Sequence, residues 1–260
     1  MSSENGDYDW RIYAHFKGMV NPNPYDPSPH KSEESEIFVS SMTKDRTGHL
    51  IGFTHPRPCA MAINIAIKEA LRAETLRCSF DYSPIKSFWG DGLDITNETT
   101  PLLFDFFEAS MISVTFSVQA LETYCNEIIE MQVKGTIPIK IDKKTKQYNK
   151  EQLQNLLSLK RKLGNILPKI FSIDSPESLQ DRKVWNQYLK LETVRNKTVH
   201  LESIYTEPKV RFDTESLFFE FFGTNIRDYP KYSLDMMDYF KPKLKNYEWL
   251  DKAREILIST

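Results

Sequence analysis

Three polar residues near the end of one predicted helix have types and spacing suited to phosphate chemistry. They are Arg195, Asn196 and His200, in a stretch 185–202 that contains neither Gly nor Pro. Histidine titrates close to neutral pH, so an imidazole suits acid–base catalysis. The arginine guanidinium stays charged, and its planar donor fork matches phosphate oxygens. Asn196 precedes His200 by one helical turn and could orient the imidazole or bind phosphate.

These three residue types fit the requirements of RNA cleavage without a metal ion, the activity that the family resemblance of the segments at 117–129 and 191–200 implies. The 2′-hydroxyl of RNA attacks the neighbouring phosphate, which requires a proton acceptor and a cation for the charge that develops on phosphorus. His200 would be the acceptor and Arg195 the cation. A structural alternative has Arg195 paired with Glu192 or Glu202 while His200 fills an edge of the core. A third possibility is a small-molecule or nucleotide site in a cleft beside Arg195.

One long helix, at about 176–203, is predicted to position the motif. The sequence Asp-Ser-Pro-Glu at 174–177 supplies an acceptor cap and an early proline. At about 100° per residue, Tyr188 and Leu191 fall within roughly 40° of Arg195 on a helical wheel. An arginine in an apolar stripe is costly to bury unless a polar or charged group meets it, which favours a functional role.

A second long helix is predicted at about 100–131, and its first half is apolar on nearly every side. Such a helix is buried on more than one face, either at the centre of its own bundle or against a partner chain. We expect the core to pair this helix with the motif helix. Helical spacing also predicts helices at about 60–77, 150–167, 213–222, 231–240 and 246–258, with a loop at 79–99.

The first 58 residues are predicted to form an extension with short β-strands, ahead of a helical domain at 59–260. Alternating apolar and polar side chains indicate a strand at 10–17. A hairpin is predicted from residues 37–42 and 50–54. The fold class that these patterns favour is therefore mainly α, with an N-terminal extension that carries short strands.

A basic stretch runs from Lys134 to Lys169. It holds ten Lys or Arg and two acidic residues, a local excess of eight positive charges in a chain of net charge −2. Such an excess would collect RNA phosphates and make binding salt-sensitive, although a solvated charged loop explains it equally well. The candidate RNA-binding residues are Lys140, Lys143, Lys144, Lys146, Lys160, Arg161 and Lys162.

Composition narrows the class of protein. A hydrophobic content of 40% with 27% charged residues is that of an ordinary soluble globular protein, and the net charge argues against a general positive coat. Three widely spaced cysteines without a CxxC pair fit a reducing cytosol better than a disulfide or zinc framework. The sequence shows no signal peptide, no run that reaches membrane-span length, no set of metal ligands and no cofactor motif. We therefore expect a cytoplasmic protein with no membrane partner, no metal and no cofactor.

Two segments together resemble the HEPN superfamily. They are Ser-Val-Gln-Ala-Leu-Glu-Thr-Tyr-Cys-Asn-Glu-Ile-Ile at 117–129 and Leu-Glu-Thr-Val-Arg-Asn-Lys-Thr-Val-His at 191–200. The superfamily motif is an Arg, usually a polar residue after it, and a His four to six residues further on. The resemblance covers roughly 100–205 and implies a helical bundle, often dimeric and often a metal-independent ribonuclease. The settings it implies are toxin–antitoxin systems, with an antitoxin as a possible partner, phage defence and RNA processing.

The resemblance leaves two functions open. One is a metal-independent endoribonuclease of HEPN type, and the alternative is a non-catalytic HEPN-like interaction or RNA-binding module, because some members have no known catalysis. The Arg–His spacing alone is weak, since about 0.6 matches are expected by chance in a chain of this composition. No other Arg–His pair in the chain has the spacing of Arg195 and His200.

The same spacing predicts a two-fold homodimer. Arg195 and His200 lie about 140° apart on a regular helix, so one motif cannot easily aim both groups at a single phosphate. In a symmetric dimer, Arg195 of one chain could lie near His200 of the other. We expect the dimer interface to form through the excess apolar surface on the 100–121 half of the long helix.

Overall fold

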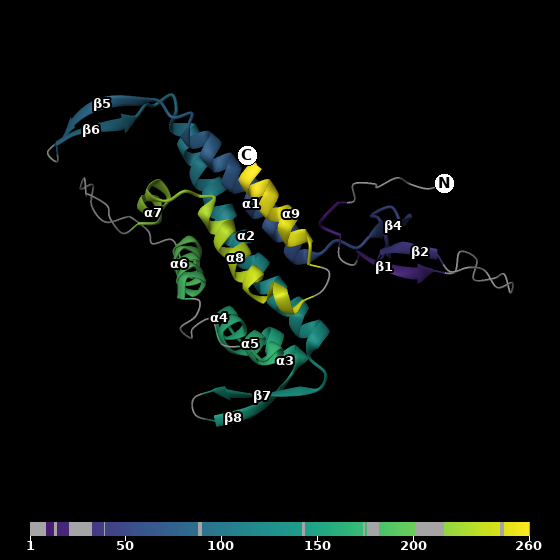
Figure 1. Cartoon of the computed structure of the whole chain (residues 1–260). Helices are drawn as coiled ribbons and strands as arrows, with labels where there is room; N and C mark the ends of the chain where they lie inside the picture. Colours follow the sequence, from purple (N-terminus) through teal and green to yellow (C-terminus); the bar gives the residue numbers. More distant parts are fainter. Residues whose placement is uncertain are drawn as a thin grey trace.

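The computed structural model describes residues 9–12, 15–20, 33–38, 40–87, 90–141, 144–173, 175, 182–200, 216–244 and 247–259. This part of the chain is mostly helical, and its strands pair in twos as short antiparallel hairpins that project from the helical body (Figure 1). The helices are α1 Pro58–Arg77, α2 Thr100–Gln132, α3 Lys150–Asn155, α4 Leu159–Arg161, the π-helical turn η1 Lys162–Ile166, α5 Leu167–Phe171, α6 Arg182–Val199, α7 Leu217–Gly223, α8 Asp228–Phe240, the 3₁₀ turn η3 Lys241–Lys243 and α9 Trp249–Ser259. The strands are β1 His15–Val20, β2 Glu33–Phe38, β3 Ser40–Lys44, β4 Leu50–Thr54, β5 Tyr82–Ser87, β6 Gly90–Ile95, β7 Thr136–Ile141 and β8 Lys144–Asn149.

The centre of the core is the antiparallel pair α1 and α2, whose contact is the most extensive between any two described helices. Small residues line this contact, so the two backbones come close. The Ser113 hydroxyl of α2 donates a hydrogen bond of 2.9 Å to the Ala66 carbonyl of α1. On another side of α2, the Ser233 hydroxyl of α8 donates to the Ser117 carbonyl at 2.8 Å. Serines spaced along α2 therefore let two neighbours pack against it.

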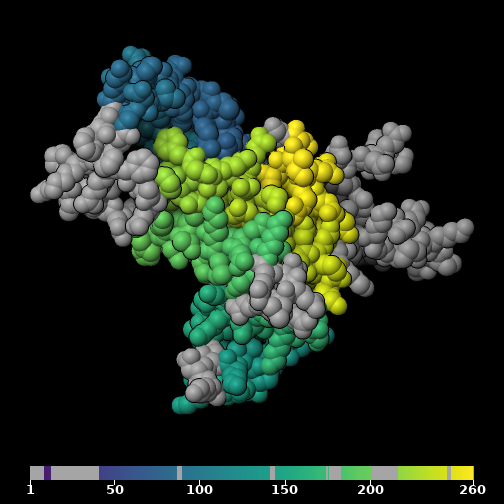
Figure 2. Space-filling view, turned by 60° about the vertical axis from the view of Figure 1, so that its left-hand side comes forward, coloured from purple at the N-terminus to yellow at the C-terminus, as the bar shows by residue number. Residues whose placement is uncertain are grey.

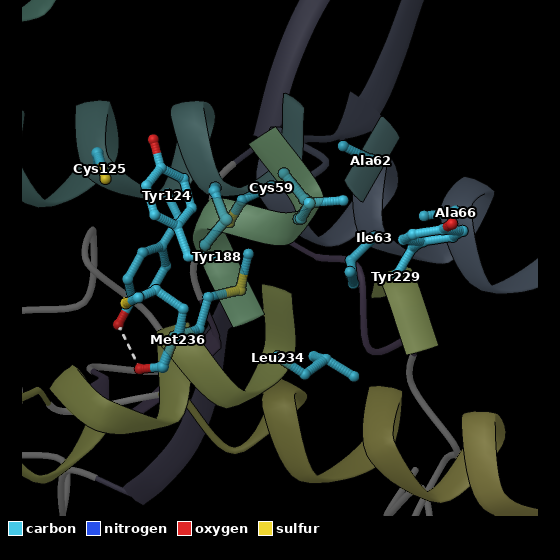
Figure 3. Packing of buried hydrophobic residues seen from close by; sticks show 14 of the residues in the cluster. Cys59, Ala62, Ile63, Ala66, Tyr124, Cys125, Tyr188, Tyr229, Leu234 and Met236 are labelled. Atoms are coloured by element: carbon cyan, nitrogen blue, oxygen red, sulfur yellow. Dashed lines mark hydrogen bonds between the residues drawn. The ribbon is translucent and has the colours of Figure 1, made fainter. Parts of the chain in front are cut away.

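The remaining helices cover this pair. α8 packs on α2, where the buried Tyr124 hydroxyl donates to the Met237 carbonyl at 3.0 Å. α6 packs against both α2 and α8, and α9 packs against α1 and α8. Figure 3 shows buried residues of α1, α2, α6 and α8 in one cluster, among them Ile63, Tyr188 and Leu234.

The predicted long helices are confirmed, but the main contact of α2 is different. The helices expected at 60–77, 100–131, 213–222, 231–240 and 246–258 correspond to α1, α2, α7, α8 and α9. The motif helix is α6 for residues 182–199, and His200 follows its end. Residues 176–181 and 201–203 of its predicted range, with Asp174, Pro176 and Glu177 of its predicted cap, lie outside the described residues. α2 does contact α6, as expected, yet its larger partner is α1.

The helix predicted at 150–167 is wrong as a single element. Its residues form α3, α4 and η1, with a break at 156–158. The backbone of Ser158 is extended, and the Ser158 side chain accepts a hydrogen bond from the Arg161 amide at 3.4 Å, so Ser158 caps a new helix. A serine favours such a cap over a helix interior, and this preference overrides the apolar spacing on either side.

The loop predicted at 79–99 is also wrong, because residues 82–95 contain the β5–β6 hairpin. Tyr82 pairs with Ile95 and Ser87 with Gly90. Gly90 has φ 113°, a conformation that favours glycine at the turn end of the ribbon. Pro84 is tolerated because each strand of a two-stranded ribbon has a free edge, where a missing N–H breaks no pairing. Pro and Gly here mark a hairpin and not a structureless loop.

The N-terminal region does contain short strands, as predicted. β3 pairs with β4, close to the predicted hairpin, and β1 pairs with β2. The strand predicted at 10–17 starts later, at His15, because the Asp9 side chain accepts from the Arg11 amide at 3.0 Å and holds a turn there. This region joins the helical body through the Arg57 amide, which donates to the Arg11 carbonyl at 2.6 Å.

One helix departs from the prediction that no segment reaches membrane-span length. Among the described residues, α2 is long and apolar enough to cross a membrane by length and composition. The central helix of a soluble bundle meets the same criterion, and the buried side chains of α2 contact α1, α6 and α8. The criterion alone therefore does not make α2 a membrane helix.

Candidate active site

The candidate site lies at the C-terminal end of α6. Trp185, Tyr188, Leu191 and Val194 are buried and fix α6 against the core. The Tyr188 hydroxyl donates to the Glu192 carboxylate at 2.8 Å, one turn along the same helix. These contacts hold α6 in place. The motif lies at the less buried, C-terminal end of this helix.

Arg195 is half-buried and Asn196 is exposed. Nη1 of Arg195 donates a hydrogen bond of 3.2 Å to Oδ1 of Asn196, so the two side chains lie together at the surface. Within the described residues, no carboxylate lies within ion-pair distance of this guanidinium. A charged donor fork whose partner is a neutral amide is still able to receive an anion.

His200 follows the last residue of α6 and its side chain is exposed. The His200 amide donates to the Asn196 carbonyl at 2.9 Å, which closes the final turn. This position also favours a cation, because the carbonyl end of a helix carries partial negative charge. His200 is therefore held by its backbone, with its imidazole directed away from the buried core.

The structure brings Arg195 and Asn196 together but does not join His200 to them through side chains. In the described part of the chain, the only hydrogen bond between His200 and the other two residues is the backbone one. This arrangement agrees with the wide angle between Arg195 and His200 on the helical wheel. Within one copy of the chain, the Arg195 guanidinium and the His200 imidazole are therefore not directed at the same phosphate.

The structural alternative loses one of its two proposed partners. Glu192 accepts the Tyr188 hydroxyl, and no ion pair joins Glu192 to Arg195 among the described residues. Glu202, the other proposed partner, lies outside the described residues, as do all residues from 201 to 215. His200 does not fill a core edge as that alternative requires, since its side chain is exposed.

Comparison with known proteins identifies no relative. No family model, curated protein or solved structure matches this chain. The resemblance to the HEPN superfamily therefore depends on the motif and its helical setting.

The predicted RNA-binding residues fall into three groups. Lys140, Lys144 and Lys146 are exposed on the β7–β8 hairpin, and Lys160 and Arg161 are exposed on α4. Lys143 lies outside the described residues. Lys162 is buried, and the prediction for this residue is wrong.

Lys162 is buried because its ammonium completes a polar cluster between α2 and α3. Nζ donates to the Glu122 carboxylate, to Oδ1 of Asn126 at 2.8 Å and to the Gln154 carbonyl at 2.6 Å. Three acceptors match the three protons of an ammonium, and the carboxylate balances its charge. The Lys162 ammonium is therefore occupied inside the protein and does not face a nucleic acid.

Sequence reasoning also missed a second buried polar cluster, around Glu127 of α2. The Tyr247 hydroxyl donates to Oε1 of Glu127 at 2.9 Å, and Sγ of Cys59 donates to Oε2 at 3.2 Å. Nε of Arg57 lies 3.4 Å from Oε1, and the guanidinium lies over the Tyr247 ring at 4.8 Å. Burial, and then the neighbouring Glu127 charge, raise the pKa of the Cys59 thiol well above its ordinary value, so this cysteine stays a thiol.

One feature of the sequence does indicate this buried cluster. Glu127 falls between apolar steps of the predicted long helix, where a charged residue needs a buried partner. No spacing rule could have identified Tyr247 or Arg57 as that partner, because both are far away in the chain. Among the described residues, no group of three His, Cys, Asp or Glu is arranged to hold a metal ion.

Proposed function

We propose that this protein is a metal-independent endoribonuclease of HEPN type. The observation that carries the proposal is the pair of half-buried Arg195 and exposed Asn196, with exposed His200 one turn further, at the end of a helix anchored in the core. The guanidinium has no carboxylate partner in the described chain, so it is able to bind a phosphate. The exposed imidazole is able to exchange protons with a bound substrate.

The reaction follows from these two groups. The His200 imidazole takes the proton of an RNA 2′-hydroxyl as that oxygen attacks the adjacent phosphorus. The new bond joins the 2′-oxygen to phosphorus, and the bond from phosphorus to the 5′-oxygen of the next nucleotide breaks. An imidazolium gives a proton to that leaving oxygen, while Arg195 stabilises the negative charge on the phosphate oxygens.

We infer that two copies of the chain build the site. His200 and Arg195 of one copy share no side-chain hydrogen bond in the described structure, so a second copy is needed to bring an imidazole to the partner guanidinium. An apolar surface suited to the contact is present on the first half of α2, where Phe104 is 60% and Ile112 is 36% exposed. A two-fold contact through such a surface buries both residues twice.

The cellular setting in this proposal is a toxin–antitoxin or phage-defence system in the cytoplasm, with an antitoxin as a further partner. A second candidate function is a non-catalytic HEPN-like interaction module. The position of His200 favours it, because a histidine at a helix C-terminus stabilises the helix without any catalytic role. Activity measurements separate the two.

The direct test is incubation of a mixed-sequence RNA with the protein in excess EDTA. We expect wild type to cut the RNA, and Arg195→Ala and His200→Ala to lose the activity while keeping the wild-type circular dichroism spectrum. Arg46→Ala and His49→Ala are matched controls, since both residues are exposed on the β3–β4 hairpin, and both variants should cut like wild type. Cleavage that needs a metal, or that survives in His200→Ala, overturns the proposal.

A further inference from the structure

Six exposed cations gather around the β7–β8 hairpin, and none of them forms an ion pair with a described residue. We call them the hairpin basic surface: Lys140, Lys144 and Lys146 on the strands, Lys160 and Arg161 on α4, and Lys169 on α5. All six are exposed, and the Lys169 ammonium donates to the Pro138 carbonyl of β7, so α5 reaches the hairpin. Figure 2 shows this segment, in teal, projecting from the rest of the molecule.

Several cations on α6, α8 and α9 form ion pairs, unlike the six of the hairpin basic surface. Lys190 pairs with Glu220 at 3.2 Å, Lys231 with Asp235 at 3.0 Å, and Arg254 bonds Asp235 at 3.0 Å. None of the six surface cations lies within ion-pair distance of a described carboxylate. This part of the described chain therefore carries positive charge that none of its ion pairs balances.

Two carboxylates near the hairpin are engaged by other lysines, and the exposed Glu151 of α3 pairs with none of the six cations. Lys150 pairs with Glu130 at 2.6 Å, and Lys162 occupies Glu122. The hydrogen bond from Lys150 lowers the pKa of the Glu130 carboxyl, so this carboxylate stays charged and bound to Lys150. Glu122 and Glu130 therefore leave the charge of the six cations unbalanced.

The hairpin is an ordered scaffold for its lysines. Ile139 is buried, and Ile137 and Tyr148 are half-buried, so one face of the ribbon packs on the helical body. Asn149 and Gln152 form a capping box that joins β8 directly to α3. An anchored ribbon holds its charges in a fixed pattern, as a binding surface needs.

The register places these lysines on both faces of the ribbon. Lys146 is opposite Ile139, on the face that packs on the body, and Lys140 is opposite Thr145, on the other face. Opposite residues share a face, and successive residues alternate. A flat membrane could contact only one face at a time, whereas a flexible polyanion can follow both. The pattern favours a nucleic-acid strand over a lipid surface.

We propose that the hairpin basic surface binds the phosphate backbone of RNA. The inference rests on the proposed ribonuclease function and deepens it, because it names the surface that collects the substrate. Binding there needs no base contacts, so single-stranded DNA of the same length should bind within a few-fold of RNA. Cleavage, in contrast, needs the 2′-hydroxyl, so the two properties separate.

The test is fluorescence anisotropy with a labelled single-stranded RNA of mixed sequence. All proteins carry His200→Ala, so the probe is not cut and failure of the cleavage proposal leaves the result readable. The variant is Lys140→Glu with Lys144→Glu and Lys146→Glu. The control makes the same charge change at Lys44, Lys86 and Lys183, which are exposed on β3, β5 and α6.

We expect the hairpin variant to bind RNA at least about 10-fold more weakly, with the slope of log affinity against log salt reduced by about 2, while the control stays within about 3-fold. Gln in place of Glu at the same three hairpin positions should give a smaller loss in the same direction, and circular dichroism should match wild type for all. Three results overturn the proposal: no RNA binding by the parent protein, equal losses in hairpin and control variants, or tighter binding to phosphatidylserine vesicles than to RNA.

Discussion

The Arg195 guanidinium donates to the Asn196 amide oxygen at 3.2 Å, and this pair lies one turn before His200. An arginine bound to a neutral amide keeps most of its donor capacity, because the guanidinium carries five N–H groups. The contact therefore orients the guanidinium without neutralising it. Arg195 therefore remains able to bind a phosphate, as the proposed function requires.

The fork shape of the guanidinium should matter as much as its charge. Arg195→Lys keeps one positive charge but loses the planar pair of donors, so we expect kcat/KM for RNA cleavage to fall about 100-fold. Melting temperature should stay close to wild type, because Arg195 is at the less buried end of α6. Full activity in Arg195→Lys would mean that only the charge is needed, and the phosphate-fork role would be wrong.

The shared site predicts complementation between two inactive chains. A mixture of Arg195→Ala and His200→Ala should recover part of the activity, because each mixed dimer has one site with both groups intact. Light scattering at micromolar concentration should show a dimer for each variant. No recovery in the mixture, with dimers present, would show that one chain supplies both groups.

The apolar surface on α2 gives a second test of the dimer. Phe104→Asp places a charge where we expect two copies to meet, and should yield an inactive monomer. Since Phe104 is 60% exposed in the single chain, the monomer's own stability should change by about 0.5 kcal/mol or less. If the Phe104→Asp protein stays dimeric, the dimer contact does not involve this surface.

The buried Lys162 should be a stability residue and not an RNA contact. Lys162→Ala leaves Asn126 and Glu122 without their shared donor, and we expect it to lower the free energy of unfolding by about 3 kcal/mol. This is the low end of the range for breaking a buried pair, because the Glu122 side chain keeps 31% exposure to water. Lys160→Ala is the exposed control and should change stability by about 0.5 kcal/mol or less in urea unfolding. Equal stabilities for the two variants would contradict the buried contact.

Stability should fall at high pH because of buried tyrosines. Burial is the main cause that raises the pKa of Tyr124, Tyr188, Tyr229 and Tyr247 in the folded protein. Tyrosines in the unfolded chain ionise near pH 10, so the unfolded state gains stability above that pH and the folded state does not. The contribution is present below about pH 10 and is lost as pH rises further.

The measurement is urea unfolding between pH 8 and 11. Tyr247→Phe should show a shallower decline than wild type, since one buried hydroxyl is removed. At neutral pH the same variant should lose about 1–2 kcal/mol, because the Glu127 carboxylate loses a hydrogen bond. Unchanged wild-type stability from pH 9 to 11 would contradict the assignment.

Local sequence patterns predicted the helices better than they predicted which helices pack together. The apolar spacing of α1 and α2 was enough to predict both helices, since their periodicity is long and uninterrupted. That α2 packs most closely on α1 depends on contacts such as Ser113 to Ala66, which no local pattern encodes. The β5–β6 hairpin was missed because its Pro84 and glycines are turn signals that a two-stranded ribbon also tolerates.

The same limit applies to the candidate site. The positions of Arg195, Asn196 and His200 on one helix end could be predicted from their spacing. The burial of Lys162 could not, because its partner Glu122 lies 40 residues earlier in the chain. A count of charges along the sequence does not distinguish Lys162 from its exposed neighbours. The difference comes from the contacts of Lys162 in η1 with Glu122 and Asn126 of α2.

The chemistry at the 2′-hydroxyl is the most direct test of the central claim. The substrate is an RNA with one cleavage position, compared with the same strand carrying a single 2′-deoxy nucleotide there, both in excess EDTA. We predict that wild type cuts only the unmodified strand and leaves a 2′,3′-cyclic phosphate on one product and a 5′-hydroxyl on the other, as detected by mass spectrometry. Cleavage of the 2′-deoxy strand, or products that end in a 5′-phosphate, would contradict the account.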